Sequence, residues 1–200
     1  MISTPRRSLT TLTEKTRRTR RHDPDRRERI TEVAVELIAE RGLEGLTHRA
    51  IAERADVSLS STTYHFADRE ALIRAALERA ADRFAGFVRS WAEEYSTAGP
   101  ERIAEALADS VMACLGEGRT NAIVEYELHT AALRRPDLRE AASLSARAST
   151  EALTPLVGPV AAATIPPLMT GLCLRAMTAP TPPTRDEVLT ILRSALHPPQ

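Results

Sequence analysis

Aromatic residues are scarce in this sequence, at 4% of its 200 positions. Strands favour aromatic and β-branched side chains, whereas alanine and leucine, which are plentiful here, are good helix formers. No stretch of convincing length alternates apolar and polar residues, which is the pattern of a half-buried strand. The composition therefore predicts an all-α fold.

Cysteine is also scarce. Only Cys114 and Cys173 occur, far apart in the sequence and in apolar surroundings. This pattern is typical of a reducing, cytoplasmic location and argues against a disulfide framework or a zinc site. No histidine or cysteine lies at ligand spacing from His65, so we expect no metal centre.

The motifs of common enzyme chemistry are missing. There is no G-x-S-x-G elbow, Walker loop, H-E-x-x-H or C-x-x-C sequence, and we expect neither catalysis nor a cofactor. One possible acid–base pair remains, Glu125 and His129, which face each other at i and i+4 if this segment is helical. An enzyme that uses this pair stays open as an unfavoured alternative.

A membrane-spanning segment is not expected. The N-terminus is basic, but no apolar stretch follows it, so it does not resemble a signal peptide. Residues 152–174 carry no charge, yet they contain four prolines and two glycines, a density of helix breakers that a spanning helix rarely tolerates. We interpret this run as buried protein interior.

Because a monomer rarely exposes so much apolar surface, we expect a homodimer interface within residues 137–178, including Leu168 and Leu172.

The basic charge is concentrated at the N-terminus, although the whole chain has a formal net charge of zero. Residues 1–22 hold seven basic residues and one acid, a net charge of +6. Residues 23–80 and 81–200 each have a net charge of −3. Residues 1–23 are polar and aperiodic, which predicts a basic arm that is disordered in the free protein.

Helical periodicity and breakers predict about nine helices in the rest of the chain. Apolar residues from Ile30 to Ile38 recur at i, i+3, i+4, i+7 and i+8, and Gly42 follows as a helix terminator. Thr47, Ser58 and Asp68 are expected N-caps of the next three helices. The expected helices cover residues 25–41, 48–55, 59–65, 69–95, 101–115, 121–134, 137–154, 160–178 with a break near Pro166 and Pro167, and 185–196.

The second and third predicted helices are short, and the turn at Asp56 and Val57 joins them. A longer helix precedes them. This is the arrangement of a helix-turn-helix, in which the second short helix enters the major groove of DNA and reads the bases.

The residues in this region resemble the DNA-binding domain of the TetR family of transcriptional regulators. The similarity runs through Gly42-Leu43-Glu44-Gly45-Leu46-Thr47, Ile51 to Ser58, Tyr64-His65-Phe66 and Arg69-Glu70-Ala71-Leu72. It implies a helix-turn-helix domain at residues 24–72 and a helical ligand-binding and dimerisation domain at 73–200. The implied function is a repressor that leaves a palindromic operator when a small-molecule effector binds. A helical small-molecule-binding protein without DNA function is the second alternative.

The resemblance also implies roles for single residues. Thr47 caps the second helix and contacts a phosphate, and its neighbour His48 reaches a base edge or a phosphate. Leu59, Ser60 and Ser61 open the recognition helix and contact bases, while Thr63, Tyr64 and His65 contact phosphate and sugar. Arg69 is directed at a phosphate. The full set of expected DNA-binding residues is Thr47, His48, Arg49, Ser58, Leu59, Ser60, Ser61, Thr63, Tyr64, His65 and Arg69.

Three positions depart from the usual family pattern. Asp56 and Ser60 stand where glycine is common, and Thr63 stands where tyrosine is common, which leaves one phosphate contact in doubt. Aspartate tolerates a left-handed conformation better than most residues do, so we expect the turn to survive.

The effector site is expected among large apolar residues with a few polar groups. Each of these residues is individually more typical of core, but together they mark where a pocket would form. The expected ligand-binding residues are Phe87, Trp91, Tyr95, Met112, Tyr126, His129, Met169 and Cys173. A small, largely apolar ligand would favour a conformation that holds the recognition helices at the wrong spacing.

Overall fold

The computed structural model describes residues 25–196. Its helices are α1 (Arg26–Arg41), α2 (His48–Arg54), α3 (Leu59–His65), α4 (Arg69–Glu94), α5 (Pro100–Ala113), α6 (Arg119–Ala132), α7 (Arg139–Val157), α8 (Pro159–Thr178) and α9 (Arg185–Leu196). Two short 3₁₀ helices, η1 (Leu43–Gly45) and η2 (Pro136–Leu138), precede α2 and α7. No strand occurs between residues 25 and 196, so the predicted all-α fold with about nine helices is confirmed.

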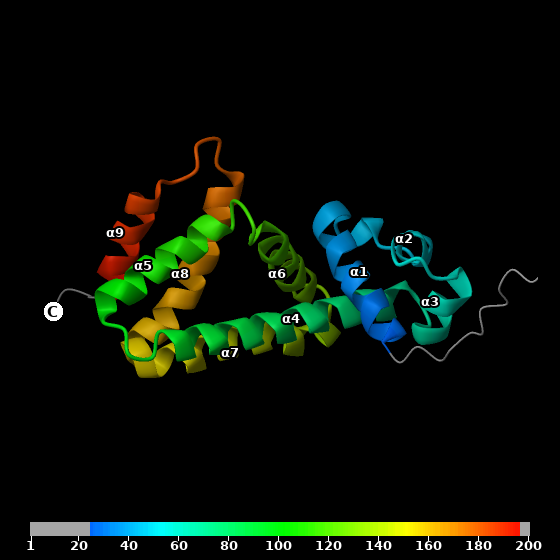
Figure 1. Cartoon of the computed structure of the whole chain (residues 1–200), viewed down its shortest axis with the longest axis horizontal. Coiled ribbons are helices and arrows are strands. Elements are labelled where there is room, and N and C mark those ends of the chain that lie inside the picture. Colours follow the sequence, from blue (N-terminus) through cyan, green and yellow to red (C-terminus); the bar gives the residue numbers. More distant parts are fainter. Residues whose placement is uncertain (1–24, 197–200) are drawn as a thin grey trace, which may run out of the picture.

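The molecule is elongated, with the three N-terminal helices at one end and α5, α8 and α9 at the other (Figure 1). Helix α4 runs along the long axis and connects the two ends, with α7 packed beside it. Its 26 residues match the long helix expected after Asp68. The expected boundary at residue 72 falls inside α4, so the two parts of the chain share one helix.

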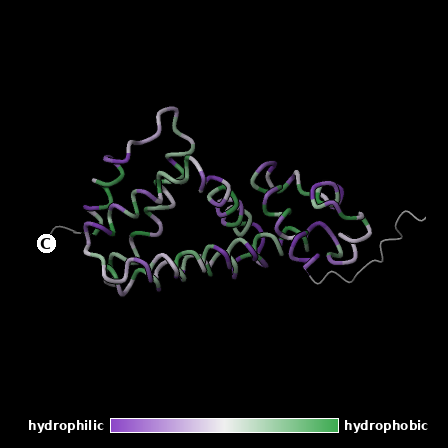
Figure 2. The backbone as a smooth tube through the Cα atoms, viewed as in Figure 1, coloured by the Kyte–Doolittle hydropathy of each residue, from purple (hydrophilic) through white to green (hydrophobic). Residues whose placement is uncertain are grey.

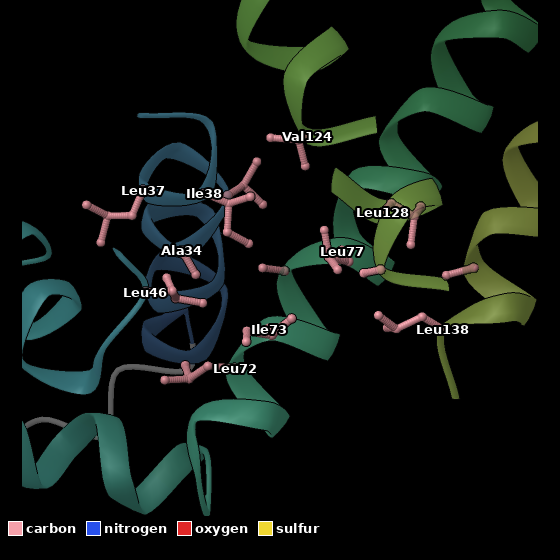
Figure 3. Packing of buried hydrophobic residues seen from close by; sticks show 14 of the residues in the cluster. Ala34, Leu37, Ile38, Leu46, Leu72, Ile73, Leu77, Val124, Leu128 and Leu138 are labelled. Carbon is pink, nitrogen blue, oxygen red and sulfur yellow. The ribbon is translucent and has the colours of Figure 1, made fainter. Parts of the chain in front are cut away.

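Two apolar cores lie along this axis. One joins α1 and the first half of α4 to α6 and to the start of α7. Figure 3 shows this packing, to which Ile38 of α1, Leu77 of α4 and Leu128 of α6 contribute. The other core is formed by α5, α8 and α9 with the end of α7. Helix α6 therefore ties the N-terminal helices to the C-terminal part of the chain.

The apolar stripe of α1 is buried as expected, and Ile30, Ala34 and Ile38 have no exposed surface. The helix ends where Gly42 adopts a φ of 67°, a left-handed value that favours glycine. In the turn between α2 and α3, Asp56 also has a left-handed φ of 50°. The turn therefore forms with aspartate in the left-handed conformation, as the sequence predicts.

The expected break at Pro166 and Pro167 is wrong, since α8 is continuous from Pro159 to Thr178. Helix α7 also continues past its expected end at residue 154 and includes Pro155. Proline fixes φ near the helical value, but inside a helix each proline loses one hydrogen bond and its ring crowds the carbonyl group four residues earlier. In α8 this cost is offset on both sides of the prolines, because Ala162 and Ile165 before them and Leu172 after them are buried in the core.

Helix α8 meets the length and composition of a membrane span, with a mean hydropathy of 1.3 over an 18-residue window. Only 28% of that window is buried within the chain, so the expectation of a fully buried interior is only partly right. In Figure 2 the backbone of α8 is mainly green and white, the colours of apolar and intermediate residues. An exposed apolar face thus remains on a helix that is otherwise part of the core.

Candidate DNA-binding surface and effector site

The helix-turn-helix is held by the caps that the sequence predicts. The Thr47 hydroxyl accepts a hydrogen bond from the Ala50 amide at 3.1 Å, and the Ser58 hydroxyl accepts one from the Ser61 amide at 3.2 Å. The Asp68 carboxylate accepts one from the Ala71 amide at 2.7 Å. Each bond satisfies an amide that the first turn of a helix leaves without a partner. These caps fix where α2, α3 and α4 begin.

Helix α3 presents large side chains to solvent. Tyr64 is 83% exposed and Leu59 is 52% exposed, while Thr62 on the opposite side is fully buried. The Tyr64 side chain therefore does not pack between helices and is available to contact DNA. The Thr63 hydroxyl lies 3.3 Å from the carbonyl oxygens of both Leu59 and Ser60, so in the free protein it bonds to its own helix.

Two expected contact residues on α2 already have partners. His48 Nδ1 lies 3.1 Å from the Thr62 hydroxyl oxygen, and that hydroxyl donates to the Leu59 carbonyl at 2.8 Å. The Thr62 oxygen is thus an acceptor for an Nδ1–H, which links α2 to α3 and orients the imidazole ring. Arg49 is exposed and forms an ion pair with Glu53 one turn later.

Arg69 has a structural role that the sequence did not reveal. Its guanidinium donates to the carbonyl oxygen of Leu46 at 2.9 Å and to that of Leu43 at 2.5 Å. Glu44 and Glu70 lie within 3.6 Å of the same group. Arg69 therefore holds the loop before α2, so an alanine at this position would disturb the DNA-binding surface as well as remove a charge.

Arg54 likewise belongs to the framework. Its two terminal nitrogens donate to the two carboxylate oxygens of Glu40 at 2.9 and 2.7 Å, and Glu36 lies 3.8 Å away. The hydrogen bond from Arg54 lowers the pKa of Glu40. This bidentate pair joins α2 to α1.

Most of the expected effector residues come together in the C-terminal core. Trp91, Met112, Tyr126 and Met169 pack against the cluster that contains Cys173. Tyr95 joins them because its ring stacks on Trp91, with centroids 4.7 Å apart. Apolar neighbours that the sequence reasoning missed are Cys114, Leu115, Leu156, Val157 and Leu168. In the sequence nothing distinguishes them from the other apolar residues of the core.

The Tyr126 hydroxyl is the main polar group at this cluster. It donates to the Thr170 carbonyl of α8 at 2.7 Å, which links α6 to α8. Burial raises the pKa of Tyr126 well above its usual range, so the phenol stays protonated and remains a donor. The Arg102 guanidinium lies 5.6 Å from the centroid of the Tyr95 ring and already covers one aromatic face.

Two expected effector residues lie apart from this arrangement. Phe87 is 58% exposed on α4 and is not part of the cluster. His129 Nε2 lies 3.1 Å from a carboxylate oxygen of Glu125, so the histidine has a partner within its own helix. Cys114 and Cys173 are far apart in the sequence, but the fold brings their sulfur atoms to 2.7 Å from each other.

The Glu125–His129 pair predicts a small pH dependence of stability. The hydrogen bond with Glu125 raises the pKa of His129 above its unfolded value. Its stabilisation is therefore fully present below about pH 6.5 and is lost as the pH rises through the raised pKa. The His129 side chain is 40% exposed, so solvent screening limits the effect to about 0.5 kcal/mol. We expect His129→Gln to lower the free energy of unfolding at pH 5.5 and to be neutral at pH 9. Equal effects of the substitution at both pH values, measured by urea unfolding, would contradict this assignment.

Comparison with known proteins agrees with this arrangement. The family model described as "Bacterial regulatory proteins, tetR family" matches residues 30–76, and the model described as "Tetracyclin repressor-like, C-terminal domain" matches residues 98–198. An uncharacterised helix-turn-helix-type transcriptional regulator from the dhlA 5′ region of Xanthobacter autotrophicus is 44% identical over 52 residues, which is 26% of each chain.

Two solved structures are similar over almost their whole length. The transcriptional regulator SCO7518 from Streptomyces coelicolor A3(2) is 34% identical, with a TM-score of 0.74 over 87% of this chain and 99% of that one. The multidrug binding protein EbrR in complex with ethidium is 37% identical, with a TM-score of 0.71 and the same coverage. The chain belongs to the TetR family of helix-turn-helix DNA-binding transcriptional regulators with a C-terminal ligand-binding domain, a family that is not enzymatic.

Proposed function

We propose that this protein is a cytoplasmic repressor that binds a palindromic operator as a homodimer and releases it when a small-molecule effector binds. The observation that carries the proposal is the exposed face of α3, where Leu59 and Tyr64 project from a helix whose other side is locked into the core by Thr62. Leu59 and Tyr64 are the large apolar side chains that this short helix exposes, and their exposure leaves them available to contact DNA.

Base contacts are assigned to the start of α3. Leu59 would pack against a thymine methyl group, which is the only apolar feature in the major groove, and Ser60 and Ser61 would hydrogen-bond to base edges. Phosphate and sugar contacts are assigned to side chains around them, and these fix the position of α3 without reading sequence. The proposed backbone-contacting residues are Thr47, His48, Arg49, Ser58, Thr63, Tyr64, His65 and Arg69.

A gel-shift assay with the DNA upstream of the protein's own gene tests these assignments. Leu59→Gln should change the preferred bases, whereas Tyr64→Ala should weaken binding to every sequence alike. We expect about tenfold weaker binding from Tyr64→Ala, because one contact to DNA is lost. Tyr64 is suited to this test because its exposure makes the substitution harmless to folding. If Tyr64→Ala binds DNA with full affinity, the proposal that α3 lies in the DNA interface is contradicted.

The homodimer is proposed to form through the exposed face of α8. Val160 is 73% exposed and Leu174 is 47% exposed, and the small residues Ala163, Thr164 and Gly171 lie between them on the solvent side of the helix. A second copy of the chain would cover this face. The small residues would then allow two helices from each subunit to pack closely against each other. Leu172 is not available for this role, because it is only 6% exposed and belongs to the core.

An aromatic cation is the effector class that we propose. EbrR has been solved in complex with ethidium, with proflavin and with malachite green, which are all aromatic cations. In this chain Tyr95 lies between Trp91 and the Arg102 guanidinium, so the outer face of Trp91 is the π surface that is left to attract a cation, and the thioethers of Met112 and Met169 adapt to differently shaped ligands. The Glu125 carboxylate on α6 is mostly buried and pairs with His129.

Ethidium binding without DNA tests the effector site. Trp91 is the only tryptophan in the chain, so its fluorescence reports on a ligand that stacks nearby. We expect Trp91→Ala to weaken ethidium binding about tenfold in isothermal titration calorimetry, in line with the loss of a desolvated cation–π contact. Phe87→Ala is the matched control, since it removes an aromatic ring from the same helix but outside the cluster. Equal losses in both variants would place the ligand elsewhere.

A further inference from the structure

The fold brings the two cysteines of the chain together. Cys114 directly follows α5, and Cys173 lies within α8, 59 positions later. Their sulfur atoms are 2.7 Å apart, compared with about 2.05 Å in a disulfide bond. Both are free thiols in this structure. The backbone therefore already holds the two sulfur atoms so close that only a small movement is needed to form a disulfide bond.

The two thiols differ in a way that suits sequential oxidation. Cys114 is half-buried, and its sulfur also lies 3.5 Å from the Ser110 carbonyl oxygen, whereas Cys173 is only 8% exposed. The hydrogen bond between the thiols lowers the pKa of Cys114 and raises that of Cys173, which burial raises further. The more accessible sulfur is thus the one favoured as thiolate, and the thiolate is the reactive form.

We infer that Cys114 and Cys173 form an oxidation-sensitive site, in which a hydroperoxide converts the thiol pair into an intramolecular disulfide that weakens operator binding. The Cys114 thiolate attacks the terminal peroxide oxygen, the O–O bond breaks, and the alcohol leaves with a proton, which gives a sulfenic acid. The Cys173 sulfur then attacks the Cys114 sulfur. An S–S bond forms, the S–O bond breaks, and the oxygen leaves as water. Overall, two thiols lose two electrons and two protons, and the peroxide is reduced to an alcohol and water.

The position of Cys114 connects this site to the DNA-binding helices. Only residues 115–118 separate it from α6, and this turn is tight, since the Gly118 amide donates to the Ala113 carbonyl at 2.9 Å. Helix α6 packs on α1, where Val124 lies near Ile38, and Leu128 belongs to the same core (Figure 3). Formation of the S–S bond replaces the contact between the sulfur atoms by a covalent link between the end of α5 and α8, and the small displacement that closes the bond acts on the start of α6 through this tight turn. The change is therefore passed to the helix that supports α2 and α3.

The experiment compares the reduced and oxidised full-length protein. Hydrogen peroxide should reduce the count of titratable thiols from two to none, leave a monomeric chain on a non-reducing denaturing gel, and be reversed by dithiothreitol. On the duplex that the reduced protein selects from random DNA, we expect oxidation to weaken binding at least about fivefold, the low end of common allosteric coupling. Cys114→Ser and Cys173→Ala are the controls, and neither should show a peroxide effect on DNA binding.

Three results would overturn the inference: two thiols that still titrate after peroxide, a disulfide between chains, or equal DNA affinity before and after oxidation. Only the last readout rests on the proposed DNA-binding function. Failure of the reduced protein to bind any DNA would refute that function instead, while the thiol count would still decide whether the disulfide forms.

Discussion

Aspartate at both Val160 and Leu174 should convert the proposed dimer into a monomer and weaken operator binding about a hundredfold. Both side chains lie on the exposed face of α8, so the added charges stay in water in a monomer. When two chains associate, the charges would be buried without partners, and this opposes association. A monomer holds one recognition helix and loses the gain of linking two half-sites, which is about 10²–10⁴ in affinity. Analytical ultracentrifugation and fluorescence anisotropy with the operator measure the two effects.

Leu133→Asp is the matched control for this experiment. Leu133 is 76% exposed at the end of α6, so the same charge is added to an apolar surface residue away from α8. The control should remain dimeric and bind DNA normally. A double variant that stays dimeric while Leu133→Asp dissociates would move the interface from α8 to the end of α6.

Deletion of residues 1–22 should reduce the slope of log DNA affinity against log salt concentration by several units. This segment, which lies outside the described residues, carries a net charge of +6, whereas residues 23–80 carry −3. Each neutralised phosphate contributes about −0.9 to the slope of log affinity against log salt concentration, so six contacts contribute about −5. Between 50 and 200 mM salt such a segment accounts for about a 10³-fold loss of affinity. Anisotropy titrations over this range measure the slope.

A full-length variant in which the seven basic residues of this segment are replaced by glutamine separates charge from length. It should behave like the deletion, and both variants should keep the preferred major-groove bases, because the readers on α3 are unchanged. The same slope and affinity in the deletion and in the wild type would show that the segment does not contact DNA.

The local structure of the DNA-binding half could be predicted because short-range rules determine it. The Thr47, Ser58 and Asp68 caps depend on residues three positions away, and the left-handed Asp56 depends on the turn it occupies. The sequence pattern also gave the length of α4, since its apolar periodicity continues to Tyr95 without a proline or a terminating glycine.

The features that could not be predicted all depend on contacts between distant parts of the chain. The continuity of α8 through Pro166 and Pro167 is maintained by core packing on both sides. Arg69 finds its carbonyl partners 23 and 26 residues earlier, and Cys114 meets Cys173 across 59 residues. Tertiary contacts of this kind leave no periodic or local signal in a single sequence.

The central claim is that two copies of α3 read a palindromic DNA site, and selection of binding sites from random DNA by the purified dimer tests it most directly. The account predicts an enriched inverted repeat whose half-site centres lie about one helical turn apart, roughly 34–36 Å, or a multiple of that distance. The same selection with Leu59→Gln should return a repeat changed symmetrically at one position in each half. Enrichment of no dyad, or of the same motif with both proteins, would contradict the claim.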